Sequence, residues 1–331
     1  MSDTPPFNQR RKFLKSAATA CAAWTVLGQG RGDAADTGSE SPVSQPDGPW
    51  LRKTLKGGML RVGSGKQWEP KFEAAIEAGF EGVELSTGNL DVADAVQAAG
   101  NTGLIIDGTV GGYHWKTTHT APDAATRARA NALLVAGLRQ TAELGGKTML
   151  LVPGHGRDGT AEEVKARAQQ AIENALSLAE DLQVKIVIEN VWNHFLYDHE
   201  GGPDQTAAAM ADFIDGFQSP FVAMQFDLGN HWKYGDTPTW VRTLGHRIDK
   251  LDIKGFSRQQ GKFTDITKGD IPWGRVREAL AEIGFRGWLA AEVGGGDLER
   301  LKLISRQMEE ALHCSQALAD VRSGSKTSTK S

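Results

Sequence analysis

Four short apolar segments in the second half of the chain each end in a carboxylate. Glu189 closes KIVIEN, Asp227 lies in VAMQFDLGN, Asp252 in IDKLDIKGF and Glu292 in GWLAAEVGGG. Apolar segments of this kind, separated by helix-like segments, indicate parallel strands that are buried on both faces. Acids at the carboxyl ends of such strands point into one crevice, where they repel one another unless a cation or shared protons compensate. The pattern therefore predicts a divalent metal site at the mouth of a β/α barrel.

Residue parity tests whether these acids can face inward, because side chains alternate along a strand. Asp252 shares its face with Lys250 and Lys254, and Asp227 shares its face with Gln225. Burying an inward-facing polar side chain in a packed interior has a free-energy penalty, which is smallest near the open upper end of the barrel. A single strand-end acid is more often a helix cap, but four in succession favour the metal site.

The elements that must position these acids follow a strand–helix alternation that begins after Trp50. The predicted strands cover 59–65, 82–86, 103–108, 147–154, 185–190, 221–228, 248–255 and 287–293. The predicted helices cover 70–78, 91–100, 123–144, 160–182, 204–217, 237–244, 272–284 and 298–319. Eight strands alternating with eight helices over about 270 residues match the usual size of a (β/α)8 TIM barrel. The alternative is a doubly wound open sheet; its dinucleotide-binding form is weakened because no GxGxxG motif follows the first strand.

The N-terminal segment has the order of a secretory signal, since Arg10 and Arg11 precede a short stretch of small apolar residues. The paired arginines resemble the twin-arginine signal, which exports folded proteins. A basic tail and a lipoprotein anchor at Cys21 are the alternatives. We therefore expect a periplasmic or otherwise exported protein. Its expected organisation is a signal peptide over 1–35, a linker over 36–56, a barrel domain over 57–320 and a flexible tail over 321–331.

The bulk composition narrows the function classes. The chain has 331 residues, 40% of them hydrophobic, with a net charge of −4, which is an ordinary globular composition. A mildly acidic balance gives no support for nucleic-acid binding. No run of eighteen apolar residues occurs, so we expect no stable membrane association.

The region from about Met59 to Ala319 resembles the sugar phosphate isomerase/epimerase superfamily, a group of xylose-isomerase-like barrels. The matching motifs are Ile188-Glu189-Asn190 on strand five, Asp227-Leu228-Gly229-Asn230 after strand six, and Gly287-Trp288 before Glu292 on strand eight. The resemblance implies a TIM barrel that holds a divalent metal ion. It also implies that Glu189 and Glu292 are the catalytic acid and base.

One departure from the family pattern concerns strand seven. The family usually has His-Val-Lys-Asp there, whereas this chain has Asp252-Ile253-Lys254-Gly255. The predicted ligands are then Glu189, Asp227, Asp252 and Glu292. This all-oxygen set favours Mn²⁺ or Mg²⁺ over zinc. His231 is a further candidate ligand that would restore a nitrogen donor, with substrate binding as its alternative role.

Other polar residues in the predicted strand-end loops are candidates for substrate binding, because such loops supply substrate contacts in barrels. Lys254 either binds a substrate oxygen or forms an ion pair with Asp252 or Asp227. The remaining candidates are His114, His155, His194 and Trp232. For each histidine the alternative is an exposed loop residue, and the aromatic side chains in these loops suit stacking on a sugar ring.

The chemistry implied by the resemblance is isomerisation or epimerisation of a sugar by proton transfer at a carbon next to a carbonyl, through an enediolate. Export favours a non-phosphorylated keto-sugar as the small-molecule substrate. A keto-sugar or keto-glycoside lyase or hydratase would use the same chemistry and remains open, as does a non-catalytic sugar-binding barrel. A phosphodiesterase of the endonuclease IV type is disfavoured, because that group relies on a histidine-rich multi-metal cluster.

Overall fold

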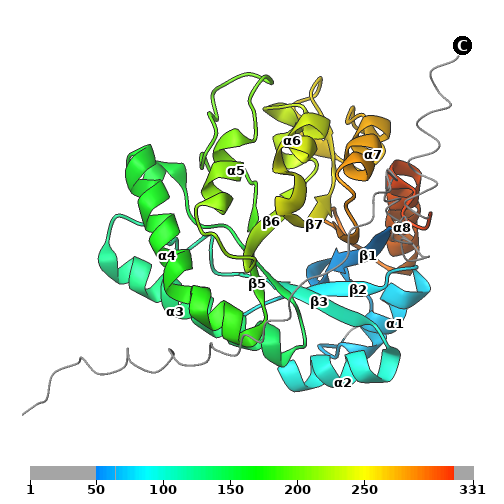
Figure 1. Ribbon diagram of the computed structural model, residues 1–331. Coiled ribbons are helices and arrows are strands. Elements are labelled where there is room, and N and C mark those ends of the chain that lie inside the picture. The colour runs from blue at the N-terminus through cyan, green and yellow to red at the C-terminus, as the bar shows by residue number, and fades with distance from the viewer. Residues whose placement is uncertain (1–49, 64, 317–331) are drawn as a thin grey trace, which may run out of the picture. The chain divides into compact units, whose positions relative to one another are not determined.

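A closed barrel of eight parallel strands forms the centre of the protein (Figure 1). The computed structural model describes residues 50–63 and 65–316. Around the barrel the strands follow the order β1-β10-β7-β6-β5-β4-β3-β2, and the helices alternate with them along the chain. The predicted (β/α)8 TIM barrel is therefore confirmed. The predicted signal peptide, the tail over 321–331 and residues 36–49 of the predicted linker lie outside the described residues.

The bounds of the elements agree with most of the sequence-based expectations to within a few residues. The barrel strands are β1 Leu51–Lys56, β2 Gly82–Ser86, β3 Ile105–Val110, β4 Thr148–Leu151, β5 Lys185–Glu189, β6 Val222–Asp227, β7 Ile248–Ile253 and β10 Gly287–Ala291. The helices are α1 Glu69–Glu77, α2 Val92–Thr102, α3 Ala124–Glu143, α4 Ala161–Leu182, α5 Ala208–Asp215, α6 Thr237–Leu244, α7 Trp273–Glu282 and α8 Leu298–Leu312.

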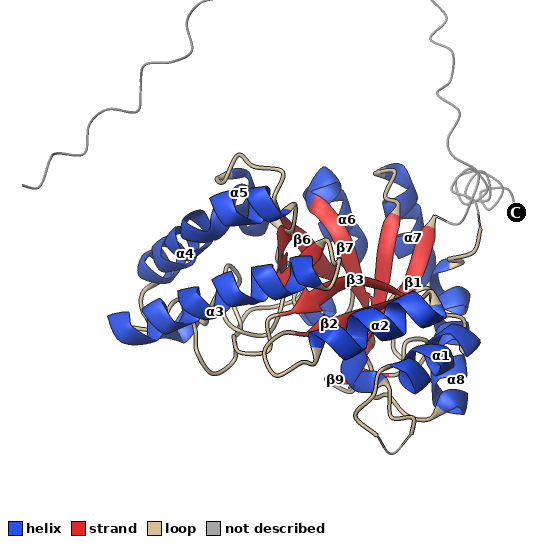
Figure 2. Ribbon diagram, turned by 90° about the horizontal axis from the view of Figure 1, so that it is seen from below, coloured by secondary structure: helices blue, strands red, loops and turns tan. Residues whose placement is uncertain are grey.

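Side-chain caps fix where several helices begin. Asp123 accepts a hydrogen bond from the Thr126 backbone N–H at the start of α3. Thr160 and Glu163 form a reciprocal capping box at the start of α4, which satisfies two otherwise free backbone donors. The helices surround the strands (Figure 2), and the largest apolar cluster fills the layer between them. None of the helices within the described residues is long and apolar enough to cross a membrane.

The first strand was predicted at the wrong place. The barrel begins with Leu51–Lys56, inside the predicted linker, and pairs with β10 and β2. Met59 instead ends a short 3-10 turn, and residues 60–63 and 65 lie in a loop. The segment LRKTLK carries three basic residues, so it lacks the apolar run by which the other strands were recognised. Its inward residue Thr54 is fully buried, and Lys56 at its end is directed into the barrel rather than into solvent.

A small antiparallel hairpin was not predicted at all. Strands β8 Gly255–Ser257 and β9 Lys262–Thr264 pair directly after β7. They lie within the region assigned to the end of the seventh strand and the loop that follows it. The hairpin brings Phe263 to the pocket described below.

The interior of the barrel has two unlike halves. One half is apolar and consists of Leu150, Val152, Val187, Val191 and Ala223, with Val110 packed against them. The other half is ionic, and its charged side chains are Lys56, Glu84, Asp107, Lys250 and Asp252. Barrels of this class usually fill the interior with layers of branched apolar side chains. In the ionic half, paired charges therefore take the place of this apolar packing.

Candidate active site

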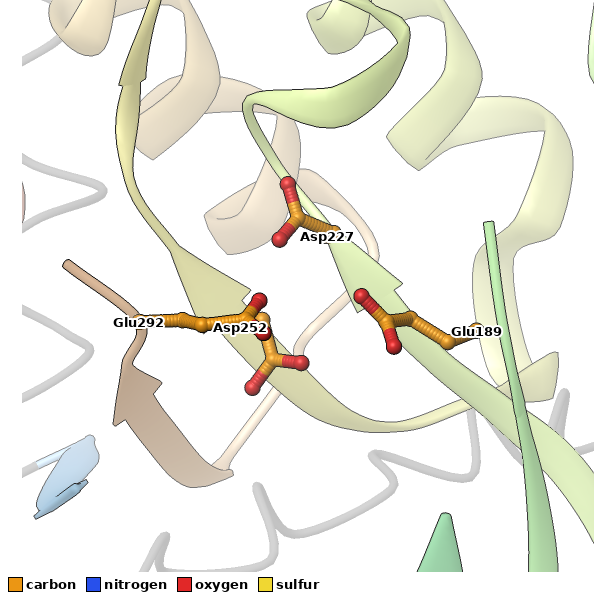
Figure 3. A group of neighbouring side chains, drawn as sticks. All are labelled: Glu189, Asp227, Asp252 and Glu292. Carbon is orange, nitrogen blue, oxygen red and sulfur yellow. The ribbon is translucent and has the colours of Figure 1, made fainter. Parts of the chain in front are cut away.

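Four carboxylates converge at the carboxyl ends of four neighbouring strands. Glu189 ends β5, Asp227 ends β6, Asp252 lies on β7 and Glu292 follows β10 (Figure 3). One carboxylate oxygen from each of the four residues lies within 4.8 Å of the corresponding oxygens of the other three. Asp227 and Asp252 are fully buried and Glu189 is 7% exposed, whereas the Glu292 side chain is 36% exposed. The predicted metal ligands of the four strands are therefore brought together.

Backbone and amide donors orient the two acids on β5 and β6. One oxygen of Asp227, Oδ1, accepts hydrogen bonds from the backbone N–H groups of Gly229 (2.8 Å) and Asn230 (2.6 Å). The Asn230 side-chain amide donates to Glu189 Oε1 at 3.2 Å. Asn190 ties the two strands together, because its side chain accepts from the Asp227 N–H and donates to the Asp227 carbonyl. The motifs around Glu189 and Asp227 thus hold the carboxylates in place.

Lys254 lies between two of the acids. Its Nζ is 3.0 Å from Asp227 Oδ2 and 2.7 Å from Glu292 Oε2, and it donates to Asn230 Oδ1 at 3.2 Å. Gly229 permits this approach, because a Cβ there would lie 2.6 Å from the Cγ of Lys254. Of the two expected roles, the ion pair with Asp227 is present, and Lys254 also lines the pocket.

A second group of charges below the four acids was missed by the sequence analysis. Lys56 Nζ lies 2.5 Å from Glu84 Oε2 and 2.9 Å from the Asp252 carboxylate. Deeper in the barrel, Lys250 Nζ lies 2.5 Å from Asp107 Oδ2 and 3.2 Å from Glu84 Oε1. Glu84 on β2 thereby links the buried Lys250 to the pocket. A lone acid within the otherwise apolar segment GVELS is the signal that points to it.

The electrostatic environment raises the pKa of most of these acids. Burial raises the pKa of Glu189 well above its usual range, and the neighbouring carboxylates add to this effect. Burial also raises the pKa of Asp227 to about 6 and that of Asp252 to about 7. For Glu292, burial again disfavours the charged form, but the nearby lysine ammonium groups outweigh it and lower the pKa.

The donor set fits a divalent cation. Asp227 Oδ2 and Glu292 Oε2 are buried and face the Lys254 ammonium at 3.0 Å and 2.7 Å, but neither accepts a well-aligned hydrogen bond, so each keeps acceptor capacity for a cation. Six carboxylates of this region face three lysine ammonium groups, which leaves a net charge of −3 when all are ionised. Oxygen donors alone suit hard ions such as Mg²⁺ and Mn²⁺.

The four acids lie beside a pocket of about 360 Å³. Of the predicted substrate-binding residues, Lys254 and His114 line it, together with Glu189 and Glu292. His114 is buried, and burial lowers its pKa to about 4, so its ring is neutral at pH 7. Lining residues that the sequence did not single out include Lys56, Glu84, Trp115 and Phe263. Trp192, one of the loop aromatics expected to suit a sugar ring, and Asn230 of the strand-six motif also line it.

The other predicted substrate residues do not line this pocket. His155 and His194 lie beside each other with ring centroids 5.2 Å apart, in the loops after β4 and β5. The Trp232 indole donates to Asp270 at 2.6 Å and stacks on the Arg258 guanidinium, which gives it a structural role.

His231 is not brought to the four acids. Its ring packs against Tyr197, at 4.5 Å between centroids, and against Trp240, at 4.9 Å. Burial lowers its pKa to about 3, so the ring is neutral. The candidate nitrogen ligand therefore lies in an aromatic surrounding, and the group that converges contains oxygen donors only.

Comparison with known proteins decides the family. The model of the xylose isomerase-like TIM barrel family matches residues 72–314. The chain belongs to this family. The match includes seven of the eight barrel strands and all four acids. A search of curated proteins finds no match.

Several solved structures share the fold of the chain at low sequence identity. An L-ribulose 3-epimerase is 18% identical, with a TM-score of 0.68, over 85% of this chain and 98% of that one. A D-tagatose 3-epimerase-like protein is 14% identical, with a TM-score of 0.67, over 84% and 100%. The 3-keto-D-glucoside 4-epimerase of E. coli is 14% identical, with a TM-score of 0.65, over 79% and 98%. At these identities the similarity shows the common fold.

Proposed function

We propose that the protein is a metal-dependent sugar isomerase or epimerase that moves a proton at a carbon next to a carbonyl. The observation that carries this proposal is the convergence of four carboxylate oxygens within 4.8 Å beside a pocket. Family membership and the sugar epimerases among the similar structures support it. A divalent ion held by Glu189, Asp227, Asp252 and Glu292 supplies Lewis-acid stabilisation of negative charge on the substrate oxygens.

The residues of the chain supply the proton transfers in this mechanism. Glu189 and Glu292 both line the pocket; Glu189 ends β5 and Glu292 follows β10, and these two strands are three positions apart around the barrel. Two carboxyl groups separated in this way can act as base and acid on a carbon bound between them. Asn230 orients Glu189, while Lys254 holds Glu292 at the pocket wall.

The charges around the pocket favour a neutral substrate. Both lysines that line it, Lys56 and Lys254, already pair with carboxylates, and no arginine is among its lining residues in the described part of the chain. A phosphate group needs free cationic donors and would be repelled by the excess of acids. We therefore propose a non-phosphorylated keto-sugar as substrate.

We also propose that the protein acts outside the cytoplasm. The support is the order of residues near the N-terminus, where Arg10 and Arg11 precede small apolar residues. A neutral sugar is also a substrate that such a compartment can contain. Fusion of residues 1–35 to a reporter that functions only after twin-arginine export tests this; a cytoplasmic reporter would contradict it.

Solvent-deuterium exchange tests the activity directly. With Mn²⁺ or Mg²⁺ added, we expect the protein to exchange a carbon-bound proton of a keto-sugar, and a chelator to remove more than about 99% of the exchange. Mass spectrometry of the product separates the reactions, because isomerisation changes the mass of the sugar only by the deuterium it takes up, whereas dehydration removes water. Absence of exchange with every divalent ion across a panel of keto-sugars would contradict the proposal.

Metal affinity should increase with pH. Protons compete with the ion for Asp227 and Asp252, whose pKa values are raised to about 6 and about 7. Below these values the carboxyl groups are protonated, and above them they are free to bind. We expect affinity to rise about tenfold between about pH 6 and about pH 8, with release of protons on binding. Calorimetry in two buffers of different ionisation enthalpy measures both quantities, and a pH-independent affinity would contradict the ligand set.

A further inference from the structure

The mouth of the pocket is lined by exposed aromatic side chains. Trp115 is 57% exposed and Phe263 is 44% exposed, and both line the pocket that contains the acids. The other large apolar side chains exposed in residues 50–63 and 65–316 do not line it; they are Ile76, Val96, Ile105 and Leu303. The pocket therefore combines a charged floor with an aromatic rim.

The two aromatic residues come from opposite sides of the barrel. Trp115 lies in the loop after β3, and Phe263 lies in the β8–β9 hairpin after β7. Strands β3 and β7 are four positions apart in the ring of eight. The side chains therefore flank the opening from two sides, which suits a flat group held between them.

Neighbouring groups support each aromatic ring. The Phe263 ring lies 5.0 Å from that of Trp192 and 5.3 Å from that of Phe256, which is fully buried. Trp115 lies edge-on to the buried His114 at 5.6 Å. The Lys254 ammonium also lies over the Phe263 ring, 5.3 Å from its centroid. Both rings thus have inner contacts, and each is about half exposed. Exposed aromatic surface beside a polar cleft is typical of a ligand-binding site.

We propose that Trp115 and Phe263 form an outer subsite for a second ring, so that the substrate is a keto-sugar joined through a glycosidic oxygen to that ring. The reacting sugar occupies the charged part of the pocket, and the second ring stacks its apolar face on the aromatic rim. The second ring must present a flat face to the aromatic rim. That face is either the C–H face of a pyranose or the aromatic face of an aryl group. This inference rests on the proposed function for the identity of the reacting sugar.

Unreactive glycosides test the subsite without turnover. The probes are methyl β-D-glucoside, phenyl β-D-glucoside and cellobiose, with binding to the full chain measured by calorimetry in the presence of Mn²⁺. We expect the phenyl glucoside or cellobiose to bind the wild-type protein at least about tenfold more tightly than the methyl glucoside, and the tighter of the two identifies the second ring as aryl or pyranose.

Substitutions at the rim localise the effect. Trp115→Ala and Phe263→Ala should each remove most of this tenfold preference and change methyl glucoside binding less than about twofold. Leu303→Ala on α8 is the matched control for loss of an exposed apolar side chain, and it should leave the preference intact. Because Phe263 also contacts Trp192 and Phe256, thermal unfolding of both variants checks that the fold is retained.

The outcomes separate this inference from the proposed function. Equal binding of the three probes, no measurable binding of any of them, or a preference that survives both rim substitutions would overturn the subsite. A preference that depends on the rim, together with no proton exchange on any keto-sugar, would leave the subsite standing and contradict the isomerase. Proton exchange on free keto-sugars without any such preference would support the isomerase and overturn the subsite.

Discussion

Replacement of Glu189 by Gln is expected to lower solvent-deuterium exchange about 10³-fold, within the range that a general acid or base contributes. The substitution keeps the shape of the side chain and the hydrogen bond from Asn230, but it removes the ionisable group. The loss should appear in kcat at saturating metal and substrate. Sugar binding, measured by calorimetry on the same variant, should persist.

This variant also separates an enzyme from a sugar-binding barrel. Because Glu189 is a proposed ligand, the metal content of the variant must be measured and the assay run at an ion concentration that saturates it. Glu162→Gln, an exposed acid in the first turn of α4, is the matched control and should keep full activity. Exchange above about a tenth of the wild-type rate in a metal-loaded Glu189→Gln protein would contradict the assigned role.

The four acids could be predicted from the sequence because each ends a strand that is recognisable without tertiary information. Strands β5, β6, β7 and β10 are apolar runs, and barrel closure places their carboxyl ends side by side. Family motifs then identified which strands they are. Barrel topology brings the four strand ends together, which sequence periodicity can capture. The hydrogen bonds from Asn190 and Asn230 then help to hold the carboxylates where four oxygens lie within 4.8 Å of one another.

The partners of these acids could not be predicted in the same way. Lys56 belongs to a strand whose pattern is basic and polar, and its burial depends on Glu84 and Asp252, which lie 28 and 196 residues away. Such pairings are properties of the closed barrel, not of any local pattern. The same reason explains why Trp232 and His194 do not line the pocket: aromatic residues in a strand-end loop contact either the pocket or the loop itself.

The departure on strand seven has a structural counterpart at both changed positions. Asp252, which replaces the usual histidine, accepts from Gln225 at 2.8 Å and pairs with Lys56, so it joins the four acids to the ionic half of the barrel. Gly255 replaces the usual acid because the β8–β9 hairpin lies against it; a Cβ there would be 2.1 Å from the Asp265 carbonyl oxygen. The hairpin that carries Phe263 thus requires the glycine.

Replacement of Lys250 by Met should destabilise the fold by about 3–5 kcal/mol, the range for removal of one partner from a buried ion pair. Lys250 is 1% exposed and lies between Asp107 and Glu84, which are 3% and 1% exposed. Methionine fills a similar volume but leaves the two buried acids without their shared cation. Urea unfolding at pH 7, without added metal, measures the loss.

The cause of this destabilisation can be isolated with two further variants. In Lys250→Met/Asp107→Asn, the acid that becomes uncompensated is replaced by an amide that can still accept from Thr54, which donates to Asp107 at 3.0 Å. At least about half of the lost stability should return, because the penalty comes from the uncompensated charge. Lys185→Met is the matched control: this lysine on β5 pairs with Asp249 but is 39% exposed, so its loss should cost less than about 1 kcal/mol. If Lys250→Met were as mild as Lys185→Met, the ionic half of the barrel would be hydrated rather than buried.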